Sequence, residues 1–329
     1  MLNGEMRSML QSLAMVSRQK RMLPTTLQNN LANSRNQRDI STFLNFHLSV
    51  LVKWIARSSL NYLWRRQINI WIQGARPRTL PAAIAPVIVA TVLAGKEWKP
   101  VQALLALFVS LSLQIAVNYS NDYSDGIRGT DDDRVGPVRL VASGLASAAA
   151  VKRAAQLSFL FACIAGLVLA SLSSWWVILI GIASVLAAWG YTGGHTPYGY
   201  RGFGELSVFT FFGVVATVGT YYVQTLHITA AAFAASIPMG SLSCALLAIN
   251  NIRDIPGDQA VGKKTLAVKL GDQRARKFFA LLLISAYIFP VFTGHPLALL
   301  TLLTAPAAHK IAQEVLAGAS GKDLIPLLG

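Results

Sequence analysis

The sequence is short of charge. Of its 329 residues only 13% are Asp, Glu, Lys or Arg, whereas 53% are apolar, and soluble domains typically carry about 25% charged residues. This deficit, combined with long apolar runs, excludes a disordered chain and a soluble enzyme. A membrane-embedded bundle, in which each crossing helix needs roughly 20 residues, accounts for the length instead.

Residues that form disulfides or bind transition metals are also scarce. The two cysteines, Cys163 and Cys244, lie inside apolar runs, and the five histidines show no metal-ligand spacing. A disulfide framework or a cysteine-based zinc site is therefore not predicted. We interpret both cysteines as packing residues.

Apolar runs that could cross a membrane as helices are plentiful. Lys and Arg are concentrated in every second connection between them, whereas the other connections contain only Lys96 and Lys99 as basic residues. By the positive-inside rule, the basic connections and the N-terminus face the cytoplasm. The eight predicted spans are 80–94, 101–119, 148–170, 174–192, 203–223, 228–250, 277–292 and 296–308.

The segment before Ile68 differs from the rest of the chain. It carries ten basic and two acidic residues of a chain with net charge +15, and it has no apolar run long enough to span a membrane. We expect residues 1–67 to be a flexible or interfacial leader. An Arg-rich, acid-poor leader is also typical of an organelle transit peptide. Because the other basic residues lie between apolar runs, no nucleic-acid partner is predicted.

Half of the 14 acidic residues fall in two short segments on the cytoplasmic side. Positions i, i+3 and i+4 share one face of a helix. Asp122 with Asp125, and Asp254 with Asp258, are therefore expected to present two carboxylates each to one point. Carboxylates with water are typical ligands of Mg²⁺, which commonly bridges substrate phosphates.

Basic residues follow each acidic pair and could hold the remaining phosphate oxygens, Arg bidentately and Lys as a point charge. A third segment on the same side, 191–205, is rich in Gly and aromatic residues and suits a lid or a ring-binding loop. The alternative is that all three segments are plain solvated loops, the acidic ones with capping aspartates. The basic residues concerned are Arg128, Arg134, Arg139, Lys263 and Lys264.

These motifs together resemble the UbiA superfamily of intramembrane prenyltransferases, and within it the MenA-type 1,4-dihydroxy-2-naphthoate polyprenyltransferases. The resemblance covers about 68–329. It is carried by the residues at 74–81, 118–144, 191–205 and 250–267.

The resemblance implies an all-α, polytopic membrane bundle of nine transmembrane helices around a central cavity, with lateral access for a lipid chain. About eight are recognised here, and the tail resembles the start of a ninth that is cut off at Gly329. Residues 68–329 are then the transmembrane prenyltransferase domain. The oligomeric state is not predicted.

The resemblance also implies Mg²⁺ bound through a polyprenyl diphosphate. By motif position, Asn118, Asp122 and Asp125 fall on the first metal motif, and Asp254 and Asp258 on the second. Gly129 stands where the superfamily has a third Asp, and Asp131 and Asp132 are the replacements. The expected substrate-binding residues are Asn118, Asn121, Arg128, Arg134, Arg139, Lys263, Lys264, Tyr191 and Arg76; the expected metal and catalytic residues are Asp122, Asp125, Asp254 and Asp258, with Asp131 and Asp132 as further metal ligands.

The implied reaction is Mg²⁺-dependent transfer of a polyprenyl group from its diphosphate to 1,4-dihydroxy-2-naphthoate. Loss of CO₂ and diphosphate gives demethylmenaquinol, an intermediate of menaquinone biosynthesis, at the cytoplasmic membrane. Metal and cations would stabilise the departing diphosphate, and the faces of Tyr119, Tyr123 or Tyr191 could stabilise the allylic cation. Arg76 or Arg139 could bind the carboxylate of the acceptor.

Other functions stay open at this point. Another aromatic acceptor such as 4-hydroxybenzoate is possible, because no single residue in the sequence identifies which aromatic ring the protein binds. CDP-alcohol phosphotransferases also use Asp-rich membrane motifs, but the residues after Asp125 and Gly126 depart from their pattern. A cation transporter would place acidic residues near mid-membrane within the spans, whereas here they are expected at helix ends.

Overall fold

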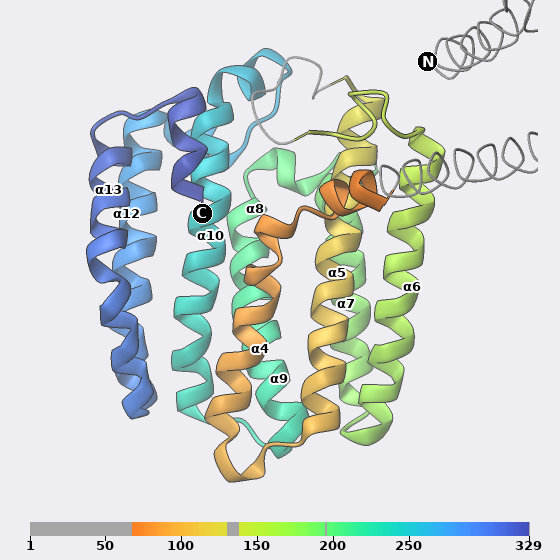
Figure 1. Ribbon diagram of the computed structural model, residues 1–329, viewed down its shortest axis with the longest axis vertical. Coiled ribbons are helices and arrows are strands. Elements are labelled where there is room, and N and C mark those ends of the chain that lie inside the picture. The colour runs from red at the N-terminus through yellow and green to blue at the C-terminus, as the bar shows by residue number, and fades with distance from the viewer. Residues whose placement is uncertain (1–67, 130–137, 195, 329) are drawn as a thin grey trace, which may run out of the picture. The chain divides into compact units, whose positions relative to one another are not determined.

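A computed structural model describes residues 68–129, 138–194 and 196–328. These residues form helices, and no strand occurs among them, so the predicted all-α class is confirmed (Figure 1). The helices belong to one compact unit, Asn69–Gly329. The predicted leader, 1–67, lies outside the described residues, and its separation from the membrane domain stays a prediction.

The helices are joined by short connections, several of which are single helical turns. The helix η4 is a π-helix, and the other η elements are 3-10 helices. The elements are η1 Pro77–Thr79, α4 Pro81–Ala94, η2 Gly95–Glu97, α5 Pro100–Ile127, α6 Ala148–Leu172, α7 Trp176–Thr192, η3 Tyr198–Arg201, α8 Gly204–Val208, η4 Phe209–Val215, α9 Ala216–Thr225, α10 Ala230–Ala260, α11 Leu266–Leu270, α12 Asp272–Ile288, η5 Phe289–Thr293, η6 Pro296–Thr304, α13 Ala305–Leu316, η7 Gly321–Leu324 and η8 Pro326–Leu328.

Five helical segments of the described residues are long and apolar enough to cross a membrane. A sixth crossing is possible if the pair Ile68–Thr79 and Pro81–Glu97, bent by 54°, is one span, and α7 is a shorter apolar helix. All eight predicted apolar segments overlap helices, but the number of eight crossings is not confirmed. The five segments are α5, α6, α10, Gly204–Thr225 and Asp272–Thr293.

Two predicted boundaries were wrong in a way that matters for the site. The span predicted at 101–119 continues as α5 to Ile127, and the span predicted at 228–250 continues as α10 to Ala260. Both acidic motifs are therefore helical. Their Asn, Ser and Asp residues have weak helix propensity, but packing inside the bundle overrides such preferences. The last predicted span, 296–308, is a 3-10 helix followed by α13 rather than one α-helix.

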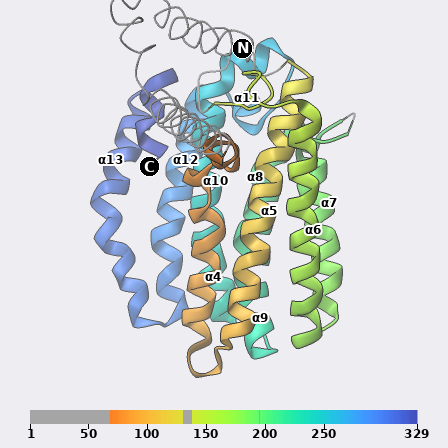
Figure 2. The same ribbon diagram turned by 45° about the vertical axis from the view of Figure 1, so that its right-hand side comes forward.

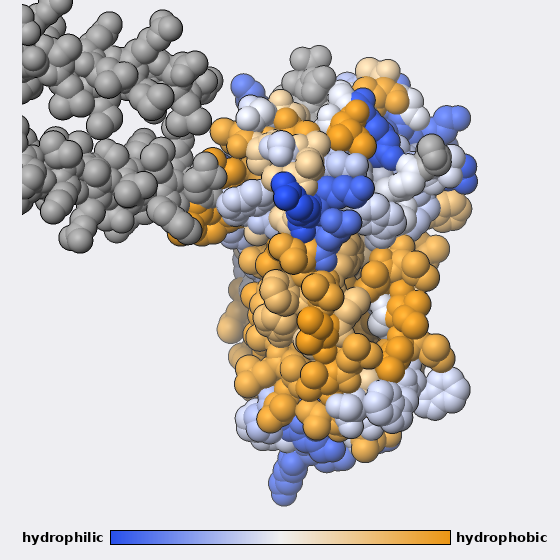
Figure 3. Space-filling model, turned by 90° about the vertical axis from the view of Figure 1, so that its right-hand side faces the viewer, coloured by the Kyte–Doolittle hydropathy of each residue, from blue (hydrophilic) through white to orange (hydrophobic). Residues whose placement is uncertain are grey.

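The outer surface of the bundle is apolar over a wide band. Figure 3 shows this band between more hydrophilic ends. Large apolar side chains are exposed on the helices; Leu186 is 67% exposed and Leu303 77% exposed. Soluble proteins rarely expose apolar patches of this extent, so the band is the surface that lipid covers, and the chain is a multi-pass membrane protein.

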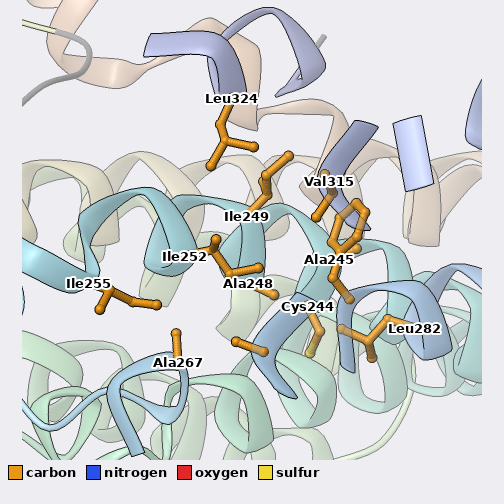
Figure 4. Close-up of a cluster of buried hydrophobic side chains, with 12 residues drawn as sticks. Cys244, Ala245, Ala248, Ile249, Ile252, Ile255, Ala267, Leu282, Val315 and Leu324 are labelled. Carbon is orange, nitrogen blue, oxygen red and sulfur yellow. The ribbon is translucent and has the colours of Figure 1, made fainter. Parts of the chain in front are cut away.

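The longest helix, α10, is also the most enclosed. It packs against α12, η4, α4 and α9, and Cys244, Ile249 and Ile252 on it join Leu282, Val315 and other side chains in a buried cluster (Figure 4). Figures 1 and 2 show α12 and α13 side by side at one edge and α6 beside α5 and α7 at the other. The helix that carries the second acidic motif is thus central and firmly held.

The two cysteines differ. Cys244 is buried in the core as predicted, but Cys163 on α6 is exposed, so its interpretation as a packing residue was wrong. Both are free thiols.

Candidate active site

A cavity of about 1770 Å³ lies between the helices of the bundle. Much of its wall is apolar, formed by side chains of α5, α6, α7, η4 and α9. Polar and charged side chains meet where the ends of α5 and α10 approach the connections that follow them. Those of the predicted site that line the wall are Arg76, Asn118, Asn121, Asp125, Arg139, Tyr191, Asp254, Asp258 and Lys263.

Asp125 is the point at which the charged segments converge. Lys263 Nζ lies 3.4 Å from its Oδ1, and Arg139 Nη2 lies 3.8 Å from its Oδ2. The Tyr200 hydroxyl donates a hydrogen bond to Oδ1. Asp125 is only 5% exposed, and burial of a charge requires such partners. The first and second motifs are thereby joined through one carboxylate.

Asp122 does not face the cavity. It is fully buried, and its two carboxylate oxygens accept hydrogen bonds from the backbone N–H groups of Leu140, at 2.8 Å, and Val141, at 3.0 Å. The expectation that Asp122 and Asp125 present two carboxylates to one point is therefore wrong, because the connection to α6 packs over the Asp122 side of the helix.

The side chain that accompanies Asp125 on the wall is Asn121, one turn earlier. Its Oδ1 accepts a hydrogen bond from the Thr192 hydroxyl at 2.7 Å. Asn118, a further turn back, donates to the Ala75 carbonyl at 2.8 Å and to the Thr79 hydroxyl at 3.0 Å. Asn118 therefore fixes the turn before α4.

That turn carries Arg76, which has left-handed backbone dihedrals (φ 54°, ψ 72°) and lines the cavity. A non-glycine residue in this region is uncommon and marks a constrained position. The bonds that Asn118 makes to either side of Arg76 are the evident constraint. The sequence pattern that singled out Arg76 did not indicate this geometry.

The second acidic pair does share one face of α10, and both carboxylates line the cavity. The Arg253 guanidinium holds both oxygens of Asp254, with Nε at 2.7 Å and Nη2 at 2.9 Å, and its side chain is 1% exposed. Asp258 accepts a hydrogen bond from the Thr265 hydroxyl at 3.3 Å. The backbone carbonyl of Asp258 accepts from the Lys263 N–H at 2.8 Å, which places the lysine beside the pair.

Several other predicted residues lie elsewhere. Arg128 is exposed and donates to the Ser124 and Thr192 carbonyls, so it joins two segments and does not line the cavity. Lys264 lines a separate small pocket. The predicted residues Asp131, Asp132 and Arg134 lie outside the described residues.

Of the three tyrosines predicted to stabilise the allylic cation, one lines the cavity and two do not. Tyr191 lines the cavity, in edge contact with Tyr198 at 5.7 Å between ring centroids. The Tyr119 hydroxyl donates to the Trp71 carbonyl at 2.7 Å, and the Tyr123 ring lies under the Lys152 ammonium at 5.6 Å. Neither Tyr119 nor Tyr123 lines the cavity, so the structure does not bring them to the site.

Sequence reasoning missed Tyr200 as an individual residue. Its ring lies under the Lys263 ammonium, 4.4 Å from the centroid, while its hydroxyl reaches Asp125. The available signal was its place in the aromatic segment 191–205. Nearby, burial raises the pKa of Tyr198, and a hydrogen bond between its hydroxyl and that of Ser207 opposes this rise only in part, so Tyr198 stays protonated at neutral pH.

Glu205 and Asn251 form a partly buried contact that the sequence also did not predict. The Asn251 amide donates to Glu205 Oε1 at 2.9 Å, Glu205 is 5% exposed, and Asn251 lines the cavity. Glu205 therefore orients Asn251 toward the interior. Both residues lie in segments that carry the resemblance, 191–205 and 250–267, but nothing in those segments predicts that two residues 46 positions apart would pair.

Among the described residues, no three His, Cys, Asp or Glu side chains gather into a metal site made by protein alone. Asp125, Asp254 and Asp258 nevertheless line one cavity beside Lys263 and Arg139. Carboxylate oxygens are the donors that Mg²⁺ prefers, and Mg²⁺ usually binds through one or two carboxylates plus substrate phosphates. The donor set thus fits a metal that a bound phosphate helps to hold.

These features define a multi-pass membrane protein with an interior site suited to a molecule that is apolar along its length and anionic at one end. The model of the UbiA prenyltransferase family matches residues 83–323. The chain therefore belongs to the UbiA prenyltransferase family, which confirms the resemblance seen in the motifs, and it is a prenyltransferase by that membership.

Named relatives agree with the family assignment. The chain is 51% identical over 265 residues to a 1,4-dihydroxy-2-naphthoate octaprenyltransferase of Mycobacterium tuberculosis, covering 78% of this chain and 90% of the relative. It is 37% identical over 272 residues to an Escherichia coli protein of the same name, covering 78% and 88%.

A solved structure shares the fold. The UbiA homolog from Archaeoglobus fulgidus bound to GPP and Mg²⁺ gives a TM-score of 0.53 at 15% sequence identity, covering 75% of this chain and 83% of that one. At this identity the likeness concerns the fold alone.

Proposed function

We propose that this protein transfers a polyprenyl group from a polyprenyl diphosphate to 1,4-dihydroxy-2-naphthoate. Diphosphate and CO₂ are lost, and the product is demethylmenaquinol for menaquinone biosynthesis. The observation that carries the proposal is the convergence of Asp125, Asp254, Asp258, Arg139 and Lys263 on one region of a largely apolar cavity. The names of the relatives from Mycobacterium tuberculosis and Escherichia coli support the choice of acceptor.

The charged region of the cavity is the proposed diphosphate site. Asp125, Asp254 and Asp258 would hold Mg²⁺, which when bound neutralises charge that builds up on the departing diphosphate. Arg139 and Lys263 would donate to phosphate oxygens in place of their present contacts with Asp125. The A. fulgidus homolog, bound to GPP and Mg²⁺, supports a metal-dependent diphosphate site in this fold.

The remaining predicted ligands enter this proposal on different grounds, some from the structure and some from the resemblance. Asn121 offers an amide oxygen on the wall one turn from Asp125. Asp131 and Asp132 stay proposed metal ligands, and Arg134 a proposed phosphate contact, on the resemblance alone.

The apolar part of the cavity is the proposed site of the polyprenyl chain. Excluding water matters here, because an allylic cation exposed to water would be captured by it. Tyr191 and Tyr200 present aromatic rings beside the charged region, and an aromatic face attracts a nearby cation. Arg76, also on the wall, is the proposed partner of the acceptor carboxylate, since guanidinium binds carboxylate bidentately.

The charged region is proposed to face the cytoplasm in the cytoplasmic membrane. The distribution of Lys and Arg between alternate connections supports this orientation. Polyprenyl diphosphate would then approach from the bilayer with its head at the cytoplasmic surface. An organelle membrane is the alternative that the Arg-rich leader leaves open.

The test uses the purified full chain in detergent with radiolabelled polyprenyl diphosphate. We expect a prenylated, decarboxylated naphthol with 1,4-dihydroxy-2-naphthoate and Mg²⁺, and no product when EDTA replaces the metal. Asp125→Asn and Asp254→Asn should each lower the rate roughly 100-fold or more, as expected when groups that stabilise developing charge are lost. Glu314→Gln, a carboxylate-to-amide change at an α13 side chain that is 43% exposed, is the matched control.

The acceptor and the metal are tested separately by this design. Product only with 4-hydroxybenzoate would keep the diphosphate site and refute the naphthoate. Undiminished activity in EDTA would refute the metal. Full activity of both Asp variants would refute the assignment of the charged region as the reaction centre.

A further inference from the structure

The described part of the connection between α5 and α6, residues 138–147, is attached to α5 through a buried carboxylate. Asp122 is fully buried, and its two oxygens accept hydrogen bonds from two consecutive backbone N–H groups, those of Leu140 and Val141. Charge-assisted hydrogen bonds of this kind are roughly twice as strong as neutral ones. Because no solvent reaches the carboxylate, neither a phosphate nor a metal in the cavity reaches it in this arrangement.

Packing independently brings the same connection against α5. A Cβ added to Gly126 would lie 2.5 Å from Val141 Cβ, closer than any ordinary contact. Leu140 is fully buried in a cluster with Tyr119, Val151 and other side chains. Side chains of residues 140 and 141 therefore pack directly against the helix at the level of Asp122.

The residue immediately before this attachment is Arg139. Its Nη2 lies 3.8 Å from Asp125 Oδ2, on the cavity side of the helix. Asp122 and Asp125 are one turn apart on the rigid helix α5. The position of the Arg139 guanidinium relative to Asp125 is thus set by the helix and by the two hydrogen bonds that Asp122 accepts.

We propose that Asp122 is a positioning residue that holds the connection so that Arg139 reaches the diphosphate, and that Asp122 is not a metal ligand. The inference rests on the proposed function, since Arg139 is assigned there to the diphosphate. Arg139 binds phosphate oxygens before and during departure of the diphosphate, so its misplacement weakens binding of the prenyl donor. The requirement for Mg²⁺ is unaffected.

The main variant is Asp122→Asn. It keeps the size and shape of the side chain but replaces one carboxylate oxygen by an NH₂ group, a donor that would face a backbone N–H. Gly126→Ala displaces the same connection by steric contact and keeps Asp122, so it serves if the first variant fails to fold. Glu314→Gln is the control for an exposed carboxylate. The measurements are hydrogen exchange of the peptide spanning 138–147 and steady-state kinetics with geranylgeranyl diphosphate at varied Mg²⁺.

In Asp122→Asn and in Gly126→Ala we expect faster exchange at Leu140 and Val141. The KM for geranylgeranyl diphosphate should rise roughly tenfold, the value of about one charge-assisted hydrogen bond, with the half-saturating Mg²⁺ concentration unchanged. In the double variant Asp122→Asn/Arg139→Ala, the KM should not exceed that of Arg139→Ala, because coupled residues are not additive.

Each opposite outcome overturns the inference. Unchanged exchange would show that Asp122 does not hold the connection. Faster exchange with an unchanged KM, or additive effects in the double variant, would show that it does not act through Arg139. A raised Mg²⁺ requirement with normal exchange would make Asp122 a metal ligand. Hydrogen exchange can be measured without catalytic turnover. If the wild-type protein shows no prenyl transfer, the proposed function is refuted, but the exchange measurement still tests whether Asp122 holds the connection.

Discussion

The ion pair between Arg253 and Asp254 allows stability and activity to be separated. Both oxygens of Asp254 are held by one guanidinium at 2.7 and 2.9 Å, and the two side chains are 1% and 14% exposed. Removing one partner of a buried pair typically costs about 3–5 kcal/mol. Since Asp254 keeps some exposure to the cavity, we expect about 3 kcal/mol for Arg253→Met, near the lower end of that range.

The expected effect is measurable by thermal unfolding in detergent, followed through the fluorescence of the seven tryptophans. At about 2–4 °C per kcal/mol for a domain of roughly this size, Arg253→Met should lower Tm by roughly 6–12 °C. Arg253→Lys should fall between that variant and the wild type, because lysine cannot hold a carboxylate with two parallel hydrogen bonds.

The decisive comparison is the double variant Arg253→Met/Asp254→Asn. It removes the charge that the single variant leaves buried, so it should regain most of the lost Tm. It should remain inactive, because Asp254 is a proposed metal ligand. Simple addition of the two single effects on Tm would refute the reasoning, as would a single variant Arg253→Met with the wild-type Tm.

Two further outcomes follow from contacts at the site and in the core. Tyr200→Phe removes a hydroxyl donor while keeping the ring under Lys263, so prenyl transfer should fall roughly tenfold, as for a lost hydrogen bond to a charged group; an unchanged rate with a folded protein would contradict a role for the hydroxyl. Gly213→Ala should destabilise the bundle by about 1–3 kcal/mol, because the added Cβ would lie 2.6 Å from the Gly240 Cα. Gly166→Ala, where a Cβ meets nothing within 4 Å, is its control, and equal Tm values for the two would refute the close helix contact.

The sequence alone determined the class of fold. Low charge and repeated apolar runs predict membrane helices, because the bilayer requires about 20 apolar residues for each crossing and leaves no alternative to an internally bonded backbone. The two Asp-rich motifs and their trailing basic residues predicted which parts of the chain would meet. Asp125, Asp254, Asp258, Arg139 and Lys263 do line one cavity.

Only the tertiary structure decided what each polar residue in those motifs contacts. Helical spacing predicted the same role for Asp122 and Asp125. In the structure Asp122 accepts hydrogen bonds from two backbone N–H groups, whereas Asp125 pairs with Lys263. The difference depends on where the connection after α5 packs, which no local pattern encodes. Tyr200 reaches Asp125 across 75 positions of sequence for the same reason. The residue type determines which interactions a side chain can make, but the packing of distant segments around it determines which partners it contacts.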